Sequence, residues 1–517
     1  MGPHSGEWGW SAHERYPPFN PIVPFDSHGE SRSDKSAETA RDYLYLTTVP
    51  VLQRAVIPNR RIHQQPVISG MFTNGPEYEG RLGKPFAPPP ITLKEIYDAV
   101  PKHLLRKNLL TSTYYCVRDI GCCIILFCFA SAIECIVDDY ISLIVGGEVK
   151  LMKITLWVVY WWWQGLVFAS FFFLGHEVQL YASVCTCGFA YAFNKLGHQG
   201  LYESQYVNDT LGFLFHSFIL SPFFAWKASH NAHHRAVASI ERDENYVPYE
   251  RSEYNLPPRA QTSSIDYSEI FDETPVFTFL KLFAVLLTGW WMYLGANFLG
   301  SRRHPNGTNH FSPYAPIFRP HERTGIILSD IGILVMCFAL CYAMAVHGFK
   351  TVMAYYFIPY MVLVQSLDRY VWKLSRCFNP SSTSIALVMV TFLQHSDPTV
   401  PHYHQEQWTW IRGAAATIDR PLLGWMGRFF LHNASHDHVA HHYFSYAPFY
   451  NLPEITKYIS GVLKEHYVYD STNTFYALYR SFTQCVFVED EDSIAFYRDK
   501  HGNAVRQVEE CLNVFVE

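Results

Sequence analysis

The chain has 517 residues, of which 17% are charged, 49% are hydrophobic and 16% are aromatic. Forty Lys and Arg against 46 Asp and Glu give a formal net charge of −6, which argues against a nucleic-acid partner because such proteins are usually strongly basic. The aromatic content also excludes disorder along the whole length. There are 25 histidines, and many of them fall in clusters.

Long apolar runs set the fold class. A membrane core of about 30 Å needs about 20 residues of helix. Four runs are long enough to cross and two are marginal: 120–137, 154–175, 276–299 and 325–348, then 211–226 and 351–364. The alternative is a large soluble enzyme with buried core helices, but four such runs favour a membrane. We therefore predict an all-α integral membrane protein with about four transmembrane helices.

Basic residues before the first run predict the orientation. Lys102, Arg106, Lys107 and Arg118 precede or open it, and the turn after it carries fewer positive charges. Loops rich in Lys and Arg tend to stay in the cytosol, so we expect the N-terminal part of the chain on the cytosolic side.

Two histidine motifs share one spacing. His230, His233 and His234 lie in HNAHH, and His438, His441 and His442 lie in HVAHH. On a helix, positions i, i+3 and i+4 share a face, so each motif can direct three imidazoles toward one point. Imidazole is a good ligand for iron, copper, nickel and zinc. A surface helix would explain one motif, but two identical motifs favour a metal site.

Three more histidines could complete a ligand set. His176 ends the second apolar run, His198 follows it after an unusual segment, and His395 ends the apolar stretch 385–394. Each of them, taken alone, is more often an ordinary histidine than a ligand.

The motifs and their flanks resemble the membrane fatty-acid desaturases, in particular the microsomal Δ12 (oleate) desaturases of fungal type. The resemblance is carried by WKASHNAHHRAVASIERDENYVP at 226–248, TFLQHSDPTVPHY at 391–403 and HDHVAHHYFSYAPFYN at 436–451. It implies two non-haem iron ions, O2 as co-substrate, cytochrome b5 and its reductase as electron donors, and a lipid-linked oleoyl substrate converted to linoleate. The implied metal ligands are His176, His198, His230, His233, His234, His395, His438, His441 and His442.

The same resemblance implies where the parts of the chain lie. The protein would be a multi-pass protein of the endoplasmic reticulum, with a helical cap on the cytosolic face that carries the di-iron site. The expected divisions are a polar disordered tail at 1–70, a cytosolic segment at 71–113, a membrane and catalytic domain at 114–470, and a cytosolic segment at 471–517.

One departure from the family pattern interrupts the first histidine box. The family has HExGH, whereas here residues 178–195 separate His176-Glu177 from Leu196-Gly197-His198. Removing them would restore the spacing, and a segment that begins with Val and ends with Lys can be bounded by GT and AG in the gene. We therefore hypothesise an unspliced intron in the gene model, and by a related hypothesis the native chain starts at Met71. If the insertion is real, metal binding or activity is in doubt.

Other polar residues near the histidine boxes are not expected to bind metal themselves. Asp397 and Asp437 are candidates for orienting ligand imidazoles, although helix capping is an equal alternative. His216 is expected to pack or bond locally. The off-spacing histidines His402, His404, His432 and His436 are not expected to be ligands.

The number of membrane crossings between the histidine boxes constrains the topology. An even number of crossings must separate the second box from His395, yet three runs lie between them: 276–299, 325–348 and 351–364. The shortness of 351–364 makes it the expected exception. The sequon at Asn306, if glycosylated, would place its loop in the lumen.

Several functions remain open at this point. Linoleate (ω-3) desaturases, bifunctional Δ12/ω-3 enzymes, hydroxylases and acetylenases share the framework. A different class is an inactive membrane protein with a broken first box.

Overall fold

The computed structural model describes residues 72–137, 149–178, 200–259, 270–271, 273–364 and 390–509. The chain divides into two compact units, 1–66 and 67–517, and every described residue belongs to the second. The finer divisions expected at 71, 114 and 471 stay predictions.

Helices form nearly all the regular structure of the described residues. The longer ones are α3 (Leu109–Cys135), α5 (Val149–Glu177), α6 (Gln205–Phe218), α7 (Phe223–Ala236), α9 (Pro275–Ala296), α10 (Arg323–His347), α18 (Leu452–Leu463) and α19 (Thr474–Gln484). The short ones are α1 (Pro76–Glu79), α2 (Leu93–Ala99), α11 (Phe349–Val352), α12 (Ile358–Val364), α15 (Trp410–Ala415), α16 (Trp425–Phe430) and α17 (His438–Tyr443). Strands β1 (His402–Tyr403) and β2 (Ile494–Ala495) pair antiparallel, with His402 opposite Ala495.

Three helical segments are long and apolar enough to cross a membrane: Leu109–Cys135, Val149–Glu177 and Pro320–His347. Two bent pairs would raise the number to five, namely α6 with α7, bent by 112°, and the two halves of α9, bent by 61°. The predicted all-α membrane fold with about four spans is therefore confirmed. The marginal run 211–226 is not one straight helix, because the chain turns sharply between α6 and α7, where Leu220 has φ +55°.

Helix α5 is the central element of the membrane-spanning bundle. It packs against α3, α6 and α12, and its C-terminal half is buried from Gln164 to Glu177. The outer helices expose large apolar side chains instead, such as Leu110 on α3 and Phe338 on α10, which are 80% and 74% exposed. Lipid is the solvent that such side chains require. The buried end of α5 places His176 at the edge of the bundle.

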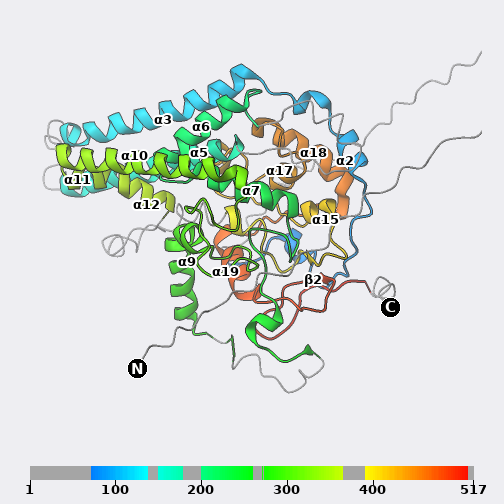
Figure 1. Ribbon diagram of the computed structural model, residues 1–517. Coiled ribbons are helices and arrows are strands. Elements are labelled where there is room, and N and C mark those ends of the chain that lie inside the picture. Colours follow the sequence, from blue (N-terminus) through cyan, green and yellow to red (C-terminus); the bar gives the residue numbers. More distant parts are fainter. Residues whose placement is uncertain are drawn as a thin grey trace, which may run out of the picture. The chain divides into compact units, whose positions relative to one another are not determined.

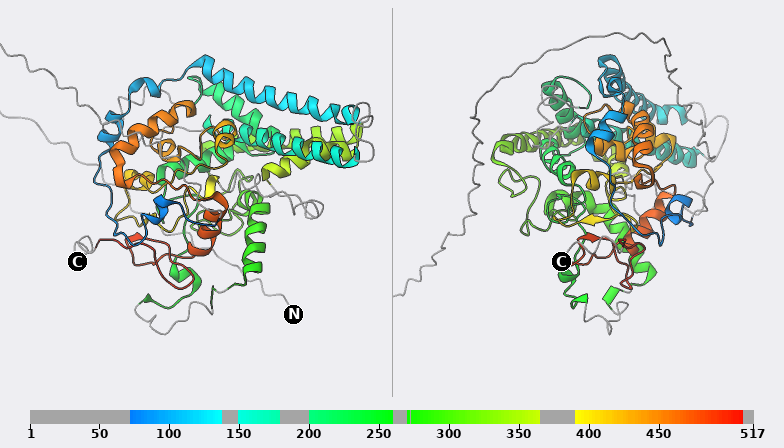
Figure 2. Two further views of the ribbon diagram at one scale, coloured as in Figure 1. Left: turned by 180° about the vertical axis from the view of Figure 1, so that it is seen from behind. Right: turned by 90° about the vertical axis from the view of Figure 1, so that its right-hand side faces the viewer.

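The remaining described segments form a compact cap at one end of the long helices. Figures 1 and 2 show α3, α5 and α10 extending away from the part that contains α15, α17, α18 and α19. Helix α18 packs against α17 and against α2, so the N-terminal segment is part of this cap. The histidine-bearing helix α17 is therefore held between other helices rather than on the surface.

The parity of the crossings follows from one contact. Nε2 of His233 lies 3.3 Å from Nε2 of His395, so the chain between them crosses the membrane an even number of times. After α10, Gly348 (φ +85°) turns the chain, and α11 and α12 return along the bundle to pack against α5. The helical return from residue 349 to 364 has a π-helical turn at Met353–Phe357. Passes by α10 and by the run 349–364 would satisfy the parity without α9, whereas a crossing by α9 would satisfy it without that run.

Helix α9 runs across the bundle rather than along it (Figure 1). Its first turns expose Val276, Phe277 and Phe279, which are 69%, 55% and 60% exposed. The candidate spans include α9 as a bent pair but not the run 351–364, so the expectation that 351–364 does not cross stays a prediction. After α9, Gly300 pairs with Asn245 behind α7, so the loop with the Asn306 sequon starts on the face of the histidines.

This topology predicts which sites are labelled from one side of a sealed vesicle. In a cysteine-depleted parent, Tyr314→Cys after α9 and Glu406→Cys in the cap should react with an impermeant maleimide on the same side. Lys350→Cys, in α11 just after the end of α10, should react only after permeabilisation. Opposite accessibility of positions 314 and 406 would show that α9 crosses.

Candidate metal centre

Helix α7 presents the first HxxHH motif. It starts directly after the turn at Leu220 and Pro222, and its 14 residues put His230, His233 and His234 on neighbouring positions of one face. All three are buried. The indole ring of Trp226 stacks on His230 one turn earlier, with ring centroids 5.0 Å apart, and fixes the plane of that imidazole.

Helix α17 presents the second motif on only six residues. His438, His441 and His442 are all buried, and Nδ1 of His438 donates to the carbonyl oxygen of Ala434 at 2.9 Å. That bond orients the ring so that Nε2 points toward His395, 3.0 Å away. A helix this short has no stability of its own, so surrounding residues must fix it.

A close helix contact positions His176 at the end of α5. The preceding residue is Gly175, where an added Cβ would lie 2.2 Å from the ring of His216 on α6. His216 bonds the carbonyl oxygen of Phe172 through Nε2 at 3.0 Å. The expectation that His216 packs and bonds locally is therefore confirmed.

Two triads of imidazoles form where these elements meet. The first triad is His176, His230 and His441, and the second triad is His233, His395 and His442. Within each triad the available ligand atoms all lie within 4.8 Å of one another. His234 and His438 adjoin them, with Nε2 of His234 3.1 Å from Nε2 of His230 and Nε2 of His438 3.1 Å from Nε2 of His442.

The structure thus brings together eight of the nine histidines expected as ligands; the ninth, His198, lies outside the described residues. The chain leaves the site after Glu177 and Val178 and is described again from Gly200, where an added Cβ would lie 2.4 Å from the carbonyl oxygen of Glu177. The described residues before and after this stretch therefore adjoin each other.

Burial sets the charge of the ligands. It lowers the pKa of His438 to about 3, and it lowers the pKa values of His395, His441 and His442 well below the ordinary value. These rings are neutral at physiological pH, which is the form that binds a metal ion. Among the described residues, Nε2 of His441 is buried without a hydrogen-bond partner, so a nitrogen of the first triad is left for a ligand. A neutral, imidazole-rich donor set suits iron.

Carboxylates contact the Nδ1 atoms of two of these imidazole rings. Asp243 accepts from Nδ1 of His233 at 2.7 Å and from the backbone N–H of Ala238 at 2.9 Å. Oε1 of Glu177 lies 3.1 Å from Nδ1 of His176. Histidines that bind metals commonly donate their second N–H to a carboxylate. Sequence reasoning missed Asp243, although an Asp one short loop beyond the HxxHH helix was a usable signal.

The two aspartates chosen from the sequence face arginines instead. Asp397 pairs with Arg420 at 2.7 Å, and Asp437 pairs with Arg428 at 2.9 Å. Burial alone would raise the pKa of Asp397, but Arg480 and Arg420 bring it below the ordinary value. Both carboxylates therefore form ion pairs with arginines rather than orienting ligand imidazoles.

The off-spacing histidines are absent from both triads, as expected. His402 lies in β1, His404 bonds Glu241 at 2.7 Å, and Nε2 of His432 lies 2.9 Å from Asp119 on α3. His436 is buried beside Gly427, whose missing Cβ would lie 2.8 Å from its ring.

Comparison with known proteins agrees with this geometry. The family model for fatty acid desaturases matches residues 160–474. A Delta(12) fatty acid desaturase of Mortierella isabellina is 32% identical over 79% of the chain and 91% of its own length. A Delta(12)-fatty-acid desaturase of Arabidopsis thaliana is 32% identical over 80% and 94%, and an oleate hydroxylase of Claviceps purpurea is 31% identical over 82% and 85%.

The two triads predict the metal content of the purified chain. The protein in detergent should bind about two transition-metal ions, one for each triad. His441→Ala should reduce uptake at the first triad and His395→Ala at the second, by about one ion each. His466→Ala, a partly exposed histidine outside both triads, is the matched control and should leave the content unchanged. Metal analysis by mass spectrometry measures the result, and unchanged content in both triad variants would contradict the assignment.

Proposed function

The chain belongs to the fatty acid desaturase family and is an oxidoreductase, and from this premise we propose that it is an acyl-lipid Δ12 desaturase that converts oleate to linoleate. The observation that carries the proposal is the meeting of two imidazole triads from four chain segments at the end of an apolar bundle. The Δ12 position is supported by the relatives from Mortierella and Arabidopsis, which are Delta(12) desaturases.

The proposed reaction removes two hydrogens from an unactivated CH2–CH2 unit, which no ordinary side chain can do. Two non-haem irons held by the triads would supply O2 activation when bound. The substrate loses two electrons and two protons, and reduction of O2 to two water molecules takes four of each. The other two electrons must come from a donor, for which we propose cytochrome b5 and its reductase.

The residues of this chain orient the ligand histidines and keep water away from them. The second-triad ligand His233 is fixed by Asp243 at 2.7 Å, and the first-triad ligand His230 is fixed by its stacking on Trp226. Burial excludes water around both triads. A fatty acyl chain reaches the site from the lipid that surrounds α3 and α10, and its depth of entry then sets the position of the double bond. We place the site on the cytosolic face of the endoplasmic reticulum, in accord with the basic residues before the first span.

A second candidate activity is hydroxylation of oleate at the same carbon. It is favoured by one observation, the oleate hydroxylase of Claviceps purpurea among the relatives at similar identity. The metal ligands would be the same, so the difference lies in how the substrate is held. Desaturation at ω-3 remains a further alternative.

Expression in oleate-rich host cells with fatty-acid analysis tests these alternatives. The full chain and a variant lacking residues 178–195 are compared, with His395→Ala as the inactive control. We expect new linoleate from at least the shortened chain, because deletion restores HxxxH and returns His198 to the turn after His176.

Other products would identify other functions. A 12-hydroxy acid would identify a hydroxylase, and linolenate from supplied linoleate would identify an ω-3 enzyme. No product from either chain would leave only a non-enzymatic role. Sequencing the transcript separately decides the intron hypothesis, which fails if every transcript encodes residues 178–195.

A further inference from the structure

A three-residue segment, 418–420, lies between two of the three parts of the chain that supply the second triad, the turn at His395 and helix α17. The backbone N–H of Ile418 donates to the carbonyl oxygen of Gln394 at 3.2 Å, next to His395. The backbone N–H of Arg420 donates to the carbonyl oxygen of Ser435 at 2.9 Å, just before α17. The segment therefore bonds to both histidine-bearing parts, and none of its own residues belongs to a triad.

Asp419 fixes the start of α17. Its side chain is fully buried, and Oδ1 accepts the backbone N–H of Val439 in the first turn at 2.8 Å. Oδ2 accepts the hydroxyl of Tyr467 at 2.6 Å. The N-cap residue Asp437 makes no side-chain cap bond of its own. Because the first N–H groups of a helix lack partners within it, Asp419 supplies the missing acceptor from a distant point in the sequence.

Arg420 fixes the turn that carries His395. Its Nε donates to the carbonyl oxygen of Leu393 at 3.1 Å, and Nη2 donates to Asp397 at 2.7 Å. These two acceptors flank His395, one on each side. Its remaining amino group, Nη1, bonds Asp470. The guanidinium, only 1% exposed, is therefore buried against the turn that carries His395.

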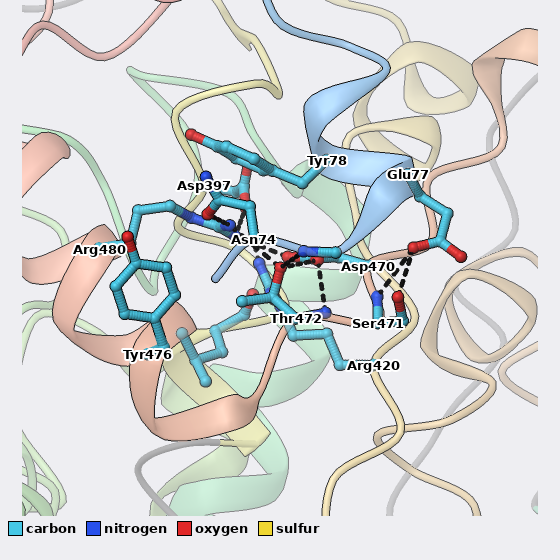
Figure 3. A network of polar contacts seen from close by, with 12 residues as sticks. Asn74, Glu77, Tyr78, Asp397, Arg420, Asp470, Ser471, Thr472, Tyr476 and Arg480 are labelled. Carbon is cyan, nitrogen blue, oxygen red and sulfur yellow. Dashed lines mark hydrogen bonds and ion pairs between the residues drawn. The ribbon is translucent and has the colours of Figure 1, made fainter. Parts of the chain in front are cut away.

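Arg420 belongs to a buried group of paired charges. Arg480 also pairs with both carboxylates, at 3.1 Å to Asp397 and 2.6 Å to Asp470, so two arginines and two aspartates form a buried quartet (Figure 3). Arg480 further bonds Asn74 at 2.8 Å. A buried ion pair contributes little net stability but costs several kcal/mol when one partner is lost, so it favours one arrangement of the chain over others.

We propose that Asp419 and Arg420 are positioning residues of the metal centre, with Arg420 acting through His395 on the second triad alone and Asp419 acting through α17 on both. The two residues differ in effect because α17 supplies His441 to the first triad and His442 to the second, whereas His395 belongs to the second triad alone. This inference rests on the proposed metal-dependent function but not on the identity of the substrate.

Co²⁺ titration of the full-length metal-free protein in detergent, followed by visible absorption, tests the proposal. The parent should bind two ions. Arg420→Met should keep one site unchanged and weaken the other at least about tenfold. Asp419→Ala should weaken both. Asp419→Asn should restore both, because its amide oxygen still accepts from Val439 and its NH2 can donate to Tyr467.

A matched control separates positioning from general destabilisation. Arg251 is also buried and pairs with Glu489 at 2.9 Å, away from the triads, so Arg251→Met should lower stability while both Co²⁺ sites stay intact. If Arg420→Met does not fold, Arg420→Met combined with Asp470→Asn removes one charge of each sign and should show the same loss of one site.

The outcomes distinguish the two proposals. Two unchanged sites in the Arg420 variants, loss of both sites in them, or equal loss in Arg251→Met would each overturn the positioning role while the parent's two sites still support the proposed function. A parent that takes up no Co²⁺ would overturn both.

Discussion

The contact between His233 and His395 is the constraint on which the rest of the structure depends. These imidazoles come from segments separated by more than a hundred and fifty residues and by the spans between them, yet their Nε2 atoms lie 3.3 Å apart. Any arrangement that moved one span to the wrong side would separate them. The bundle and the cap therefore serve one purpose, which is to keep both histidine-bearing helices at one end of α5.

Eight buried imidazoles in contact form an unfavourable core in the absence of other partners. Burial keeps His441 neutral, and each described triad retains nitrogen atoms directed at its centre. The surrounding polar groups hold the rings from behind, as Asp243 does for His233. Such a core is preorganised for a cation and poorly packed for anything else.

The sequence predicted the elements of the site better than their directions. The i, i+3, i+4 spacing was enough to place His230 and His441 on inward-facing helices, because that periodicity is a local property. Hydropathy indicated the length of α9 but not its direction, since composition does not reveal the direction of an axis. Asp397 was a candidate for orienting a ligand because it is near His395 in sequence, but Arg420 and Arg480 bind it. Asp243 follows the first HxxHH helix by one short loop, and the fold brings it behind His233.

Glu177 and Gly200 adjoin each other. The length of the chain that connects them therefore does not determine where the described ligand histidines lie. A loop whose two ends already meet can grow or shrink at a small entropic cost, roughly 0.6 kcal/mol for each doubling. His176 is held by α5 and by its neighbours on α7 and α17, none of which belongs to that connection. The described ligands therefore do not depend on the length of that connection, and the same position in the chain is a natural point for inserting a reporter sequence beside the metal centre.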